Sequence, residues 1–403
     1  PRGLESARRV GVLVRLAVQS AEFDECTGER RIDGDTIPCV LLDSVASQAN
    51  RLEEGLLESW SNGEVDFPVF GVDFSEYADL ADLGLLTTLQ TPHRIADALI
   101  RDAITTDEDP LPFRESDAGK RYTLASTKNA TAVYELCPAA LVFGVWDSTG
   151  PRGGLGSKFQ RALVSEIIGV GYSSGVKGAS RIDPAGIQSK VPVYHRKGDL
   201  SDWTADTAEA HLDKKGNPVL FSRSGAEGKG KPSAVNLSNV APSVDKQAGG
   251  VTFDYALHTL VLSFPAIRRL RFPVDVDGVV VPPEQRRAAE TAVRTALAAL
   301  ALTAVAYQRE QGYDLRSRSF LVPESPSPFQ LEFVMADGGE SNFYSFSIED
   351  ARLLVKSASA AAEKLGFGWE REPLKLKPMP KLVELIRASR RLAAESDEQS
   401  GAE

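Results

Sequence analysis

A glycine-rich segment with basic neighbours offers the clearest chemistry in this chain. The segment GVWDSTGPRGGLGSKFQRALVSEIIG begins at Gly144, and an apolar run directly before it predicts a buried strand. Its glycines and proline predict a loop. Ser157 and Gln160 stand at capping-box spacing, which predicts a helix over 157–168. A strand, a glycine loop and a helix start with basic side chains together make a site for a phosphate chain.

Two kinds of phosphate ligand fit such a segment, a nucleotide or a polymer backbone. A P-loop needs Gly directly before its Lys and Ser or Thr directly after it. Here Ser157 precedes Lys158 and Phe159 follows it. The glycines at 169–175 run G-x-G-x-x-x-G, one residue too long for a dinucleotide fingerprint. A polymer such as RNA therefore remains, beside the alternative of a tight connection with a basic solvent face.

The charge of the chain is unevenly distributed. It has 46 Lys and Arg against 56 Asp and Glu, a net charge of −10, which by itself speaks against nucleic acid. Residues 148–240 nevertheless carry 13 Lys and Arg against 8 Asp and Glu, a net charge of +5. A basic middle in an acidic chain suits a protein that holds a polyanion in one groove. Chance clustering of charges in loops is the alternative.

Candidate catalytic residues are few. His195, beside Arg196 and Lys197, is the nearest approach to a general acid–base cluster. Asp147 could hold a metal, although a lone carboxylate more often caps a backbone amide. The sequence contains no H-E-x-x-H, no G-x-S-x-G and no cysteine spacing typical of metal sites. We therefore expect no catalytic residue, no metal and no cofactor, with ribonuclease activity as the alternative.

Cysteine usage and hydropathy indicate the compartment. Cys26, Cys39 and Cys137 are odd in number and widely spaced, which fits a reducing cytoplasm. No run of 18 apolar residues is present, so no membrane span is expected. The first 18 residues are basic and then apolar, but they lack the small-residue cleavage site of a signal peptide. We expect a cytoplasmic protein without membrane contact.

Strands and helices alternate near the start of the chain. The apolar residues of 10–18 predict a strand, with a partner strand near 37–42. A helix is expected over 44–60, because its apolar side chains recur at helical spacing. Its polar side carries three side chains suited to ligand binding: Gln48, Asn50 and Arg51.

The remaining elements are predicted in the same way. Thr91 and Pro92 predict a helix start, with the helix running through Leu99. The stretch 107–131 is polar and irregular, and 172–250 is glycine-rich without periodicity, a length that is usually functional. Further strands are expected at 141–146 and near 252–264, 320–322, 329–335 and 342–346, helices over 283–311 and 347–364, and a fraying tail after 391. This order fits an α+β sheet with helices on one face.

Four stretches of the sequence resemble a known family. They are CVLLDSVASQANRLEEGLLE at 39–58, TPHRIADALIRDA at 91–103, LVFGVWDSTGPRGGLGSKFQRALVSEIIG at 141–169 and GKPSAVNLSNVAPS at 230–243. They are similar to the Cas7-type backbone subunit of type I-G (formerly type I-U) CRISPR Cascade effector complexes, a member of the RAMP superfamily. The resemblance spans roughly positions 30 to 265.

The resemblance implies a modified RNA-recognition (ferredoxin-like) fold with large thumb and web insertions. In this reading residues 1–390 form one domain, followed by a polar tail at 391–403. The core would be built from 9–60, 133–170 and 251–365, with insertions at 61–132 and 172–250. The usual aromatic RNP pattern of RNA-recognition folds is not evident, which leaves the binding mode open.

The resemblance also implies a function in antiviral defence. Several copies would line a CRISPR guide RNA as a helical filament and present it for pairing with target DNA. The protein would then read the geometry of the RNA while base pairing reads its sequence, as in other guided effectors. The implied partners are guide RNA, target DNA, further copies of the chain, the Cascade large subunit, the fused cap and processing subunit, and a recruited helicase-nuclease.

A protein that binds guide RNAs of any sequence needs phosphate contacts rather than base-edge contacts. The resemblance and the residue types together indicate the RNA-binding residues Gln48, Asn50, Arg51, Arg152, Gly153, Gly154, Ser157, Lys158, Gln160, Arg161, Arg181, Lys229, Lys231, Asn236 and Asn239. Asp183 is an alternative partner for Arg181. We expect His93 to cap or pack a helix start, and Trp146 to anchor the core rather than to stack on a base.

Overall fold

The protein combines helices with small, mostly antiparallel sheets, so the expected α+β class is confirmed. The computed structural model describes residues 11–14, 27–32, 34–150, 157–175, 177–222, 229–245, 250–316, 319–324, 329–335, 340–370 and 374–401. The chain divides into two compact units. The first takes its residues from 1–171 and 254–382, and the second from 172–253 and 383–403.

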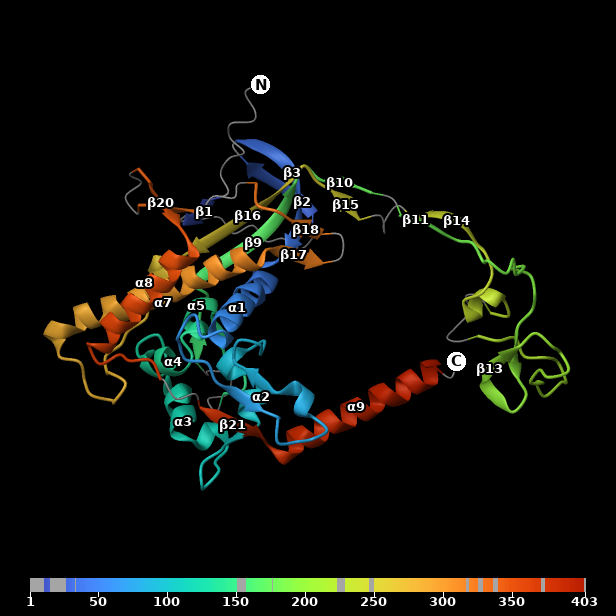
Figure 1. Cartoon of the computed structure of the whole chain (residues 1–403), viewed down its shortest axis with the longest axis horizontal. Helices are drawn as coiled ribbons and strands as arrows, with labels where there is room; N and C mark the ends of the chain where they lie inside the picture. Colours follow the sequence, from blue (N-terminus) through green and yellow to red (C-terminus); the bar gives the residue numbers. More distant parts are fainter. Residues whose placement is uncertain are drawn as a thin grey trace. The chain divides into compact units, whose positions relative to one another are not determined.

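A four-stranded antiparallel sheet of the first unit has the order β16–β9–β3–β2 (Figure 1). Its strands are β2 (Thr27–Ile32), β3 (Asp35–Asp43), β9 (Leu163–Val170) and β16 (Tyr255–Leu262). The helix expected over 157–168 is therefore wrong. The spacing of Phe159, Leu163 and Ile167 fits a helix face, but it also fits a buried strand. Here β3 and β16 pair with both edges of β9, and its β-branched side chains suit that position.

Three helices pack together in the first unit. They are α1 (Val45–Ser61), α7 (Pro283–Gln311) and α8 (Ile348–Glu363), and all three lie where the sequence predicts them. Ser347 and Asp350 form a capping box at the start of α8. At Gly55 of α1 an added Cβ would lie 3.0 Å from the backbone nitrogen of Gln308 in α7, so glycine permits this close approach.

Helix α7 is long and apolar enough to cross a membrane by length and composition alone. It is instead mostly buried in the protein, where it packs against α1, α5 (Ala139–Phe143) and α8 (Figure 1). A helix that is apolar on most of its sides is expected when a core surrounds it. Its composition is therefore explained by its place in the first unit.

A second four-stranded sheet of the first unit has the order β5–β4–β21–β6. Its strands are β4 (Gly71–Asp73), β5 (Leu85–Thr87), β6 (Ala103–Thr105) and β21 (Lys375–Pro378). Short helices accompany it: η1 (Ala81–Leu83), η2 (Arg94–Ala96), α2 (Ala98–Arg101), η3 (Phe113–Glu115), α3 (Asp117–Leu124) and α4 (Thr131–Leu136). Strand β21 thus joins the C-terminal part of the chain to two strands, β4 and β6, from its first third.

Two predictions in this region are wrong. The single helix expected from Thr91 through Leu99 is split into η2 and α2, because Arg94 has a φ of +53° and Asp97 caps a new helix. The stretch 107–131 is not irregular, since it forms η3 and α3 and buries the aromatic rings of Phe113 and Tyr122.

A three-stranded sheet joins the beginning of the chain to its last third. Strand β1 (Gly11–Val14) runs parallel to β19 (Phe329–Phe333), which pairs with β20 (Asn342–Phe346), and β17 (Tyr313–Arg316) pairs with β18 (Ser319–Leu321). Strands β18, β19 and β20 confirm the predictions near 320–322, 329–335 and 342–346, whereas β17 was not predicted. The expected pairing of the first strand with 37–42 is wrong, because β2 and β9 already flank β3.

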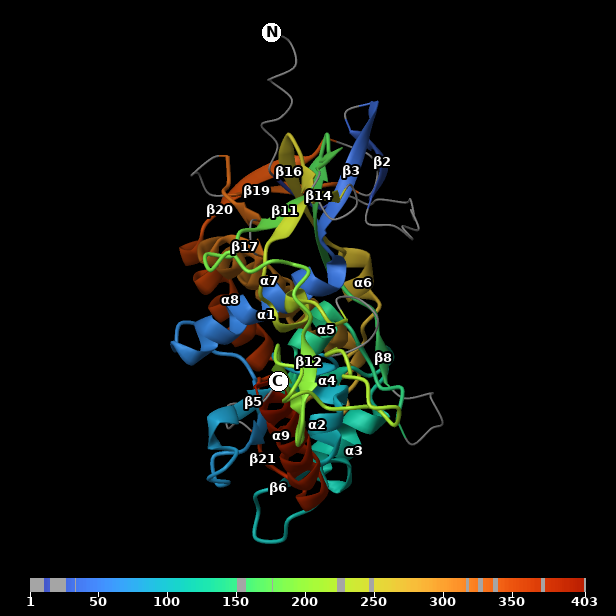
Figure 2. The same ribbon diagram turned by 90° about the vertical axis from the view of Figure 1, so that its right-hand side faces the viewer.

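The second unit contains short paired strands rather than a structureless loop. They are β10 (Ser173–Ser174) with β15 (Val251–Thr252), β11 (Lys177–Arg181) with β14 (Val240–Asp245), and β12 (Tyr194–Arg196) with β13 (Asp199–Thr204), together with η4 (Pro232–Val235). Strands β11, β12 and β14 are labelled in Figure 2. Val193, Ala210 and Phe221 are buried in it, so it has apolar packing of its own.

Helix α9 (Pro380–Gly401) continues through the segment that we expected to fray. Its residues up to Gly401 include no further proline and many Leu, Ala, Glu and Arg, which are strong helix formers. Composition near a chain end therefore predicted the wrong state for 391–401.

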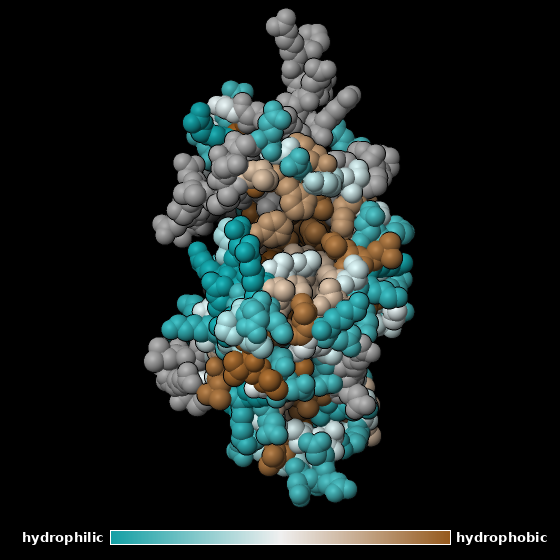
Figure 3. All heavy atoms as spheres, turned by 90° about the vertical axis from the view of Figure 1, so that its left-hand side faces the viewer, coloured by the Kyte–Doolittle hydropathy of each residue, from teal (hydrophilic) through white to brown (hydrophobic). Residues whose placement is uncertain are grey.

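Apolar side chains also reach the surface. Figure 3 shows one face on which they gather in a hollow bordered by hydrophilic side chains. In the first unit Phe343 and Tyr344 of β20 and Leu353 of α8 are exposed apolar residues. Such surface is common among soluble proteins when scattered and is typical of contact sites when continuous.

Candidate nucleic-acid interface

The glycine-rich loop connects two strands of a β-hairpin. Strand β7 (Val145–Trp146) pairs with β8 (Lys158–Phe159), and the amide of Asp147 donates to the Ser157 carbonyl at 2.9 Å. Helix α5 (Ala139–Phe143) precedes the hairpin, so 141–143 of the strand expected at 141–146 are helical, and only 145–146 form a strand. No helix begins at Ser157 among the described residues, so an anion site at a helix N-terminus is not present there. Three predicted contacts lie outside the described residues: Arg152, Gly153 and Gly154.

Buried polar contacts fix the base of this hairpin. Asp147 is 2 % exposed and accepts two hydrogen bonds from Nη2 of Arg114, at 2.9 and 3.1 Å. It also accepts from the Thr149 amide at 3.2 Å, which is the capping role that we weighed against metal binding. Ser157 is also buried, and its hydroxyl lies 3.0 Å from the carbonyls of Tyr122 and Ala125. Ser157 therefore positions the hairpin instead of facing solvent.

One face of the hairpin is exposed, aromatic and cationic. Trp146 is 55 % exposed, so the expectation that it anchors the core is wrong. Nζ of Lys158 lies 5.2 Å from the centre of its ring, within cation–π distance. Gln160 follows Lys158 by two positions and accepts from Nη1 of Arg269 at 2.8 Å. We call Trp146, Lys158, Gln160 and Arg269 the hairpin row.

Arg269 was not among the predicted site residues, although it lies in the basic run Arg268–Arg271, which begins at the last residue of helix α6 (Phe264–Arg268). The run was a usable signal, but nothing local connects it to Gln160, which is more than one hundred positions earlier.

Arg161 lies beside the hairpin row and is partly held by the backbone. Its Nε donates to the Phe143 carbonyl at 3.2 Å, and its side chain packs where a Cβ on Gly144 would lie, 2.9 Å from its Cγ. Gly144 has a φ of +83°, which also favours glycine. Burial and the nearby Arg94 guanidinium lower the pKa of Arg161 from its ordinary value. An additional anion beside Arg161 would relieve this crowding of positive charge.

The polar residues predicted on α1 do not share one exposed face. Gln48 is completely buried: its side-chain amide donates to Asp43, and its oxygen accepts from Ser165 at 2.8 Å and from Gln308 at 3.0 Å. Arg51 donates from Nε to Asp43 at 3.0 Å. The prediction that Gln48 lies on a solvated side of α1 is therefore wrong.

The remaining nitrogens of Arg51 are also engaged. They donate to the carbonyls of Asp314 and Leu315, at 3.0 and 2.7 Å. Of the three residues predicted on α1, only Asn50 has an exposed side chain. Helix α1 thus contributes mainly to the packing between β3, β9 and α7, and not to an open ligand surface.

His258 belongs to the same buried polar network. Its Nε2 lies 2.8 Å from the Ser165 hydroxyl, and its ring packs edge-on against Tyr313 with 5.3 Å between the ring centres. Because that hydroxyl donates to Gln48, Nε2 of His258 donates to it. Burial, with a smaller effect of Arg309, lowers the pKa of His258 to about 4, so the ring is neutral at pH 7.

In the second unit, polar residues gather around η4 and the ends of β11 and β14. Lys229, Lys231 and Asn236 are exposed. Asn239 accepts from the Asp183 amide at 2.6 Å, and Asp183 in turn accepts from the amides of Ala185 and Ser238. Asp183 therefore caps backbone groups, and Asn239 helps to hold the same turn.

The backbone of Arg181 lies next to this group. Arg181 is on β11 and pairs with Val240 of β14, one position after Asn239. The structure thus brings the backbone of Arg181 and Asn239 together, with η4 directly before β14 in the chain. These residues make a second, separate set of polar and basic groups within the second unit.

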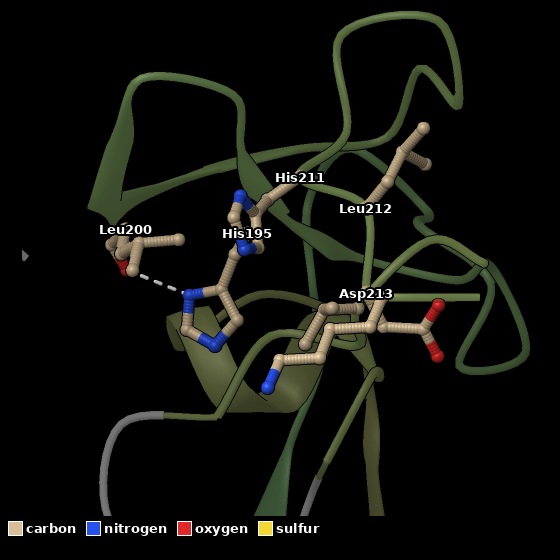
Figure 4. Close-up of a pocket in the computed structure, with 7 residues that line it drawn as sticks. His195, Leu200, His211, Leu212 and Asp213 are labelled. Atoms are coloured by element: carbon tan, nitrogen blue, oxygen red, sulfur yellow. Dashed lines mark hydrogen bonds between the residues drawn. The ribbon is translucent and has the colours of Figure 1, made fainter. Parts of the chain in front are cut away.

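An open pocket of about 640 Å³ lies in the second unit (Figure 4). It is lined by His195, Leu200, His211, Leu212, Asp213, Lys214 and Val219. Nδ1 of His195 donates to the Leu200 carbonyl at 2.6 Å, and Asp213 accepts from the amides of Lys215 and Asn217, both at 2.8 Å. Among the residues that the structure describes, no three His, Cys, Asp or Glu lie together as metal ligands.

Taken together, the first unit is an α+β protein with an exposed row of cationic, amide and aromatic side chains, an arrangement typical of surfaces that bind single-stranded nucleic acid. Residues 17–174 match the family model described as CRISPR-associated protein GSU0053 (Cas_GSU0053). The matched part is about two fifths of the chain and contains β2, β3, α1 and the β7–β8 hairpin. This match indicates a CRISPR-associated protein. The comparison with curated proteins found no match.

Proposed function

We propose that this chain is a non-catalytic, RNA-binding backbone subunit of a type I-G (formerly I-U) CRISPR Cascade complex. The observation that carries the proposal is the hairpin row. Trp146, Lys158 and Gln160 lie within the region that matches a CRISPR-associated family, and Arg269 contacts Gln160 from outside that region. The row offers positive charge and hydrogen-bond donors to phosphate groups. Those properties suit an RNA whose sequence varies from guide to guide.

In this proposal Lys158 and Arg269 contact phosphates of the guide RNA. Lysine and arginine that neutralise phosphates release counterions, which gives affinity without sequence preference. Arg161 adds positive charge next to the row, and its pKa, lowered by burial and by Arg94, rises again when an anion binds. The buried contacts of Asp147 and Ser157 hold the hairpin in place for these contacts.

The second unit supplies further contacts in the same proposal. Lys229, Lys231 and Asn236 are exposed near the paired strands β11 and β14 and bind the same guide RNA or that of a neighbouring copy. Several copies follow one guide and present its bases to target DNA. The large subunit, the cap and processing subunit, and a helicase-nuclease complete the proposed assembly.

Co-expression with a CRISPR array and the other subunits tests this function. We expect the purified protein to elute as a large particle with a high ratio of absorbance at 260 nm to that at 280 nm. Sequencing of the RNA in the particle is expected to return intact guides that contain spacers. A protein that leaves the column free of nucleic acid in the presence of all its partners contradicts the proposal.

The pocket of the second unit favours a second candidate function, a RAMP-type ribonuclease. Two histidines line it, and paired imidazoles can supply the acid and the base that RNA cleavage needs. Incubation with guide precursor or complementary RNA tests this activity, since cleavage must disappear in His195→Ala and persist in His93→Ala, a histidine outside the pocket. Intact RNA with the unaltered protein excludes the second candidate under those conditions.

A further inference from the structure

We propose that the indole of Trp146 stacks on an unpaired base of bound RNA, while Lys158 and Arg269 contact phosphates beside that base. This inference rests on the proposed function and adds to it a base-contacting residue that the phosphate contacts alone do not include. It assigns a role to a side chain that sequence reasoning had placed in the core.

The exposure of Trp146 supports a stacking contact. A tryptophan is among the largest apolar side chains, and leaving its ring in water is unfavourable. Trp146 is 55 % exposed, whereas Trp60, Trp203 and Trp369 are half-buried. The strand alternation explains its direction, because Val145 and Asp147 on either side are buried. The surface therefore presents this ring at a fixed position.

The neighbours of the Trp146 ring also support a stacking contact. Trp146 and Lys158 are directly opposite each other on paired strands, so their side chains leave the same face of the hairpin. Nζ of Lys158 lies over the ring at 5.2 Å from its centre. Because more than half of Trp146 is exposed, the ring keeps accessible surface beside that ammonium group. A base on this surface would bring its own phosphate towards Lys158.

The hairpin row continues from this pair to Gln160 and Arg269. Gln160 follows Lys158 by two positions and holds Nη1 of Arg269 at 2.8 Å. An aromatic ring with cations on one side is the arrangement with which proteins bind single-stranded nucleic acid: the ring takes a base and the cations follow the backbone. Every base has a π-face, so the contact tolerates any sequence, as a guide-binding protein requires.

Binding of a labelled single-stranded RNA to the full chain, measured by fluorescence anisotropy, tests the inference. Trp146→Ala is expected to weaken binding by about tenfold to a hundredfold, the loss typical of one stacked base. Trp146→Phe keeps a stacking ring and is expected to retain most of the affinity. The dependence of affinity on salt should not change in either variant, whereas Lys158→Ala should make the salt slope shallower by about one.

An RNA of the same length with abasic positions provides the decisive comparison. Removing the bases leaves every phosphate in place, so the unaltered protein and Trp146→Ala are expected to bind it equally well. Thermal unfolding of both variants controls for folding. Weakening by the same factor on both RNAs would mean that the ring acts through structure, which overturns the inference.

Two further outcomes separate this inference from the proposed function. If Trp146→Ala and the unaltered protein bind RNA equally well, with the same salt dependence, the stacking contact is overturned. The proposed function as an RNA-binding backbone subunit is then unaffected. Loss of a co-purifying protein subunit with unchanged RNA binding assigns the ring to a protein contact and also overturns it. An unaltered protein that binds no RNA, alone or with its partners, contradicts the proposed function itself.

Discussion

Arg94 and Glu53 form a bidentate ion pair inside the first unit: Nε of Arg94 lies 2.6 Å from Oε1 of Glu53, and Nη2 lies 2.6 Å from Oε2. Nη1 of Arg94 also donates to the Gly144 carbonyl at 3.0 Å, directly before β7. The pair therefore connects α1 with the base of the hairpin that bears Trp146 and Lys158. Burial raises the pKa of Glu53 to about 7, although Arg94 opposes this effect.

Removing one partner of this pair should destabilise the protein strongly. Arg94→Ala leaves a buried carboxylate without its cation, and such losses cost about 3–5 kcal/mol. Chemical denaturation measures the free energy of unfolding. Replacing both residues by leucine should cost less than the single substitution, because no charge is left buried. A single substitution that costs under about 1 kcal/mol would contradict this account.

The base of the hairpin is expected to matter in a different way. Asp147→Asn removes the charge that two hydrogen bonds from Arg114 satisfy, and should reduce the free energy of unfolding by about 1–3 kcal/mol. RNA affinity should fall with it, because the strand that bears Trp146 ends next to Asp147. Thr149→Ala, which leaves the Arg114–Asp147 pair intact, is the matched control and should have a smaller effect.

His258 should make stability depend on pH. Its pKa is about 4 in the folded protein, below its ordinary value of 6.5, so the unfolded chain binds more protons between these values. The stability contributed by the neutral ring is complete above about pH 6.5 and is lost as pH falls towards 4, by at most about 3 kcal/mol. The titratable groups next to the His258 ring are Asp43, Arg309 and Tyr313.

The comparison of unfolding at several pH values isolates this residue. In His258→Gln the difference in unfolding free energy between pH 7 and pH 4.5 should be smaller than in the unaltered protein. His93→Gln is the control, because His93 is exposed. An identical pH dependence in both variants would mean that His258 is not held neutral by its surroundings.

The sequence predicted correctly those elements whose ends are set by residues close to them in the chain. Helix α8 begins at a capping box formed by Ser347 and Asp350, three positions apart, and both groups are visible in the sequence. Strand β9 was missed because Phe159, Leu163 and Ile167 fit two periodicities, and only its pairing with β3 and β16 selects the strand. Long-range pairing of this kind leaves no local signal.

The same difference between local and long-range signals holds for the residues of the candidate site. Lys158 was predicted, because a lysine beside a glycine-rich loop is a local feature. Gln48 was placed wrongly, since its partners Ser165 and Gln308 are 117 and 260 positions away. Trp146 was also placed wrongly, because tryptophan is usually buried. The signal that could have corrected it is the alternation of Val145, Trp146 and Asp147, once Asp147 is known to be buried and paired with Arg114.

The charges of the two units should contribute separately to RNA binding. Lys158→Ala in the hairpin row and the double substitution of Lys229 and Lys231 by alanine in the second unit each remove phosphate contacts under the proposed function. The slope of log affinity against log salt should become shallower by about one in the first variant and by up to about two in the second. Combining them should add the two changes, because the contacts are on different phosphates.

Lys356→Ala provides the control for this experiment, since it removes one exposed cation from α8, away from the hairpin row. Its salt slope should equal that of the unaltered protein. Equal slopes in all variants would show that neither set of lysines meets phosphate, and the affinity would then have to come from uncharged contacts. A change in the second unit alone would place the guide on η4 and the β11–β14 strands and remove Lys158 from the interface.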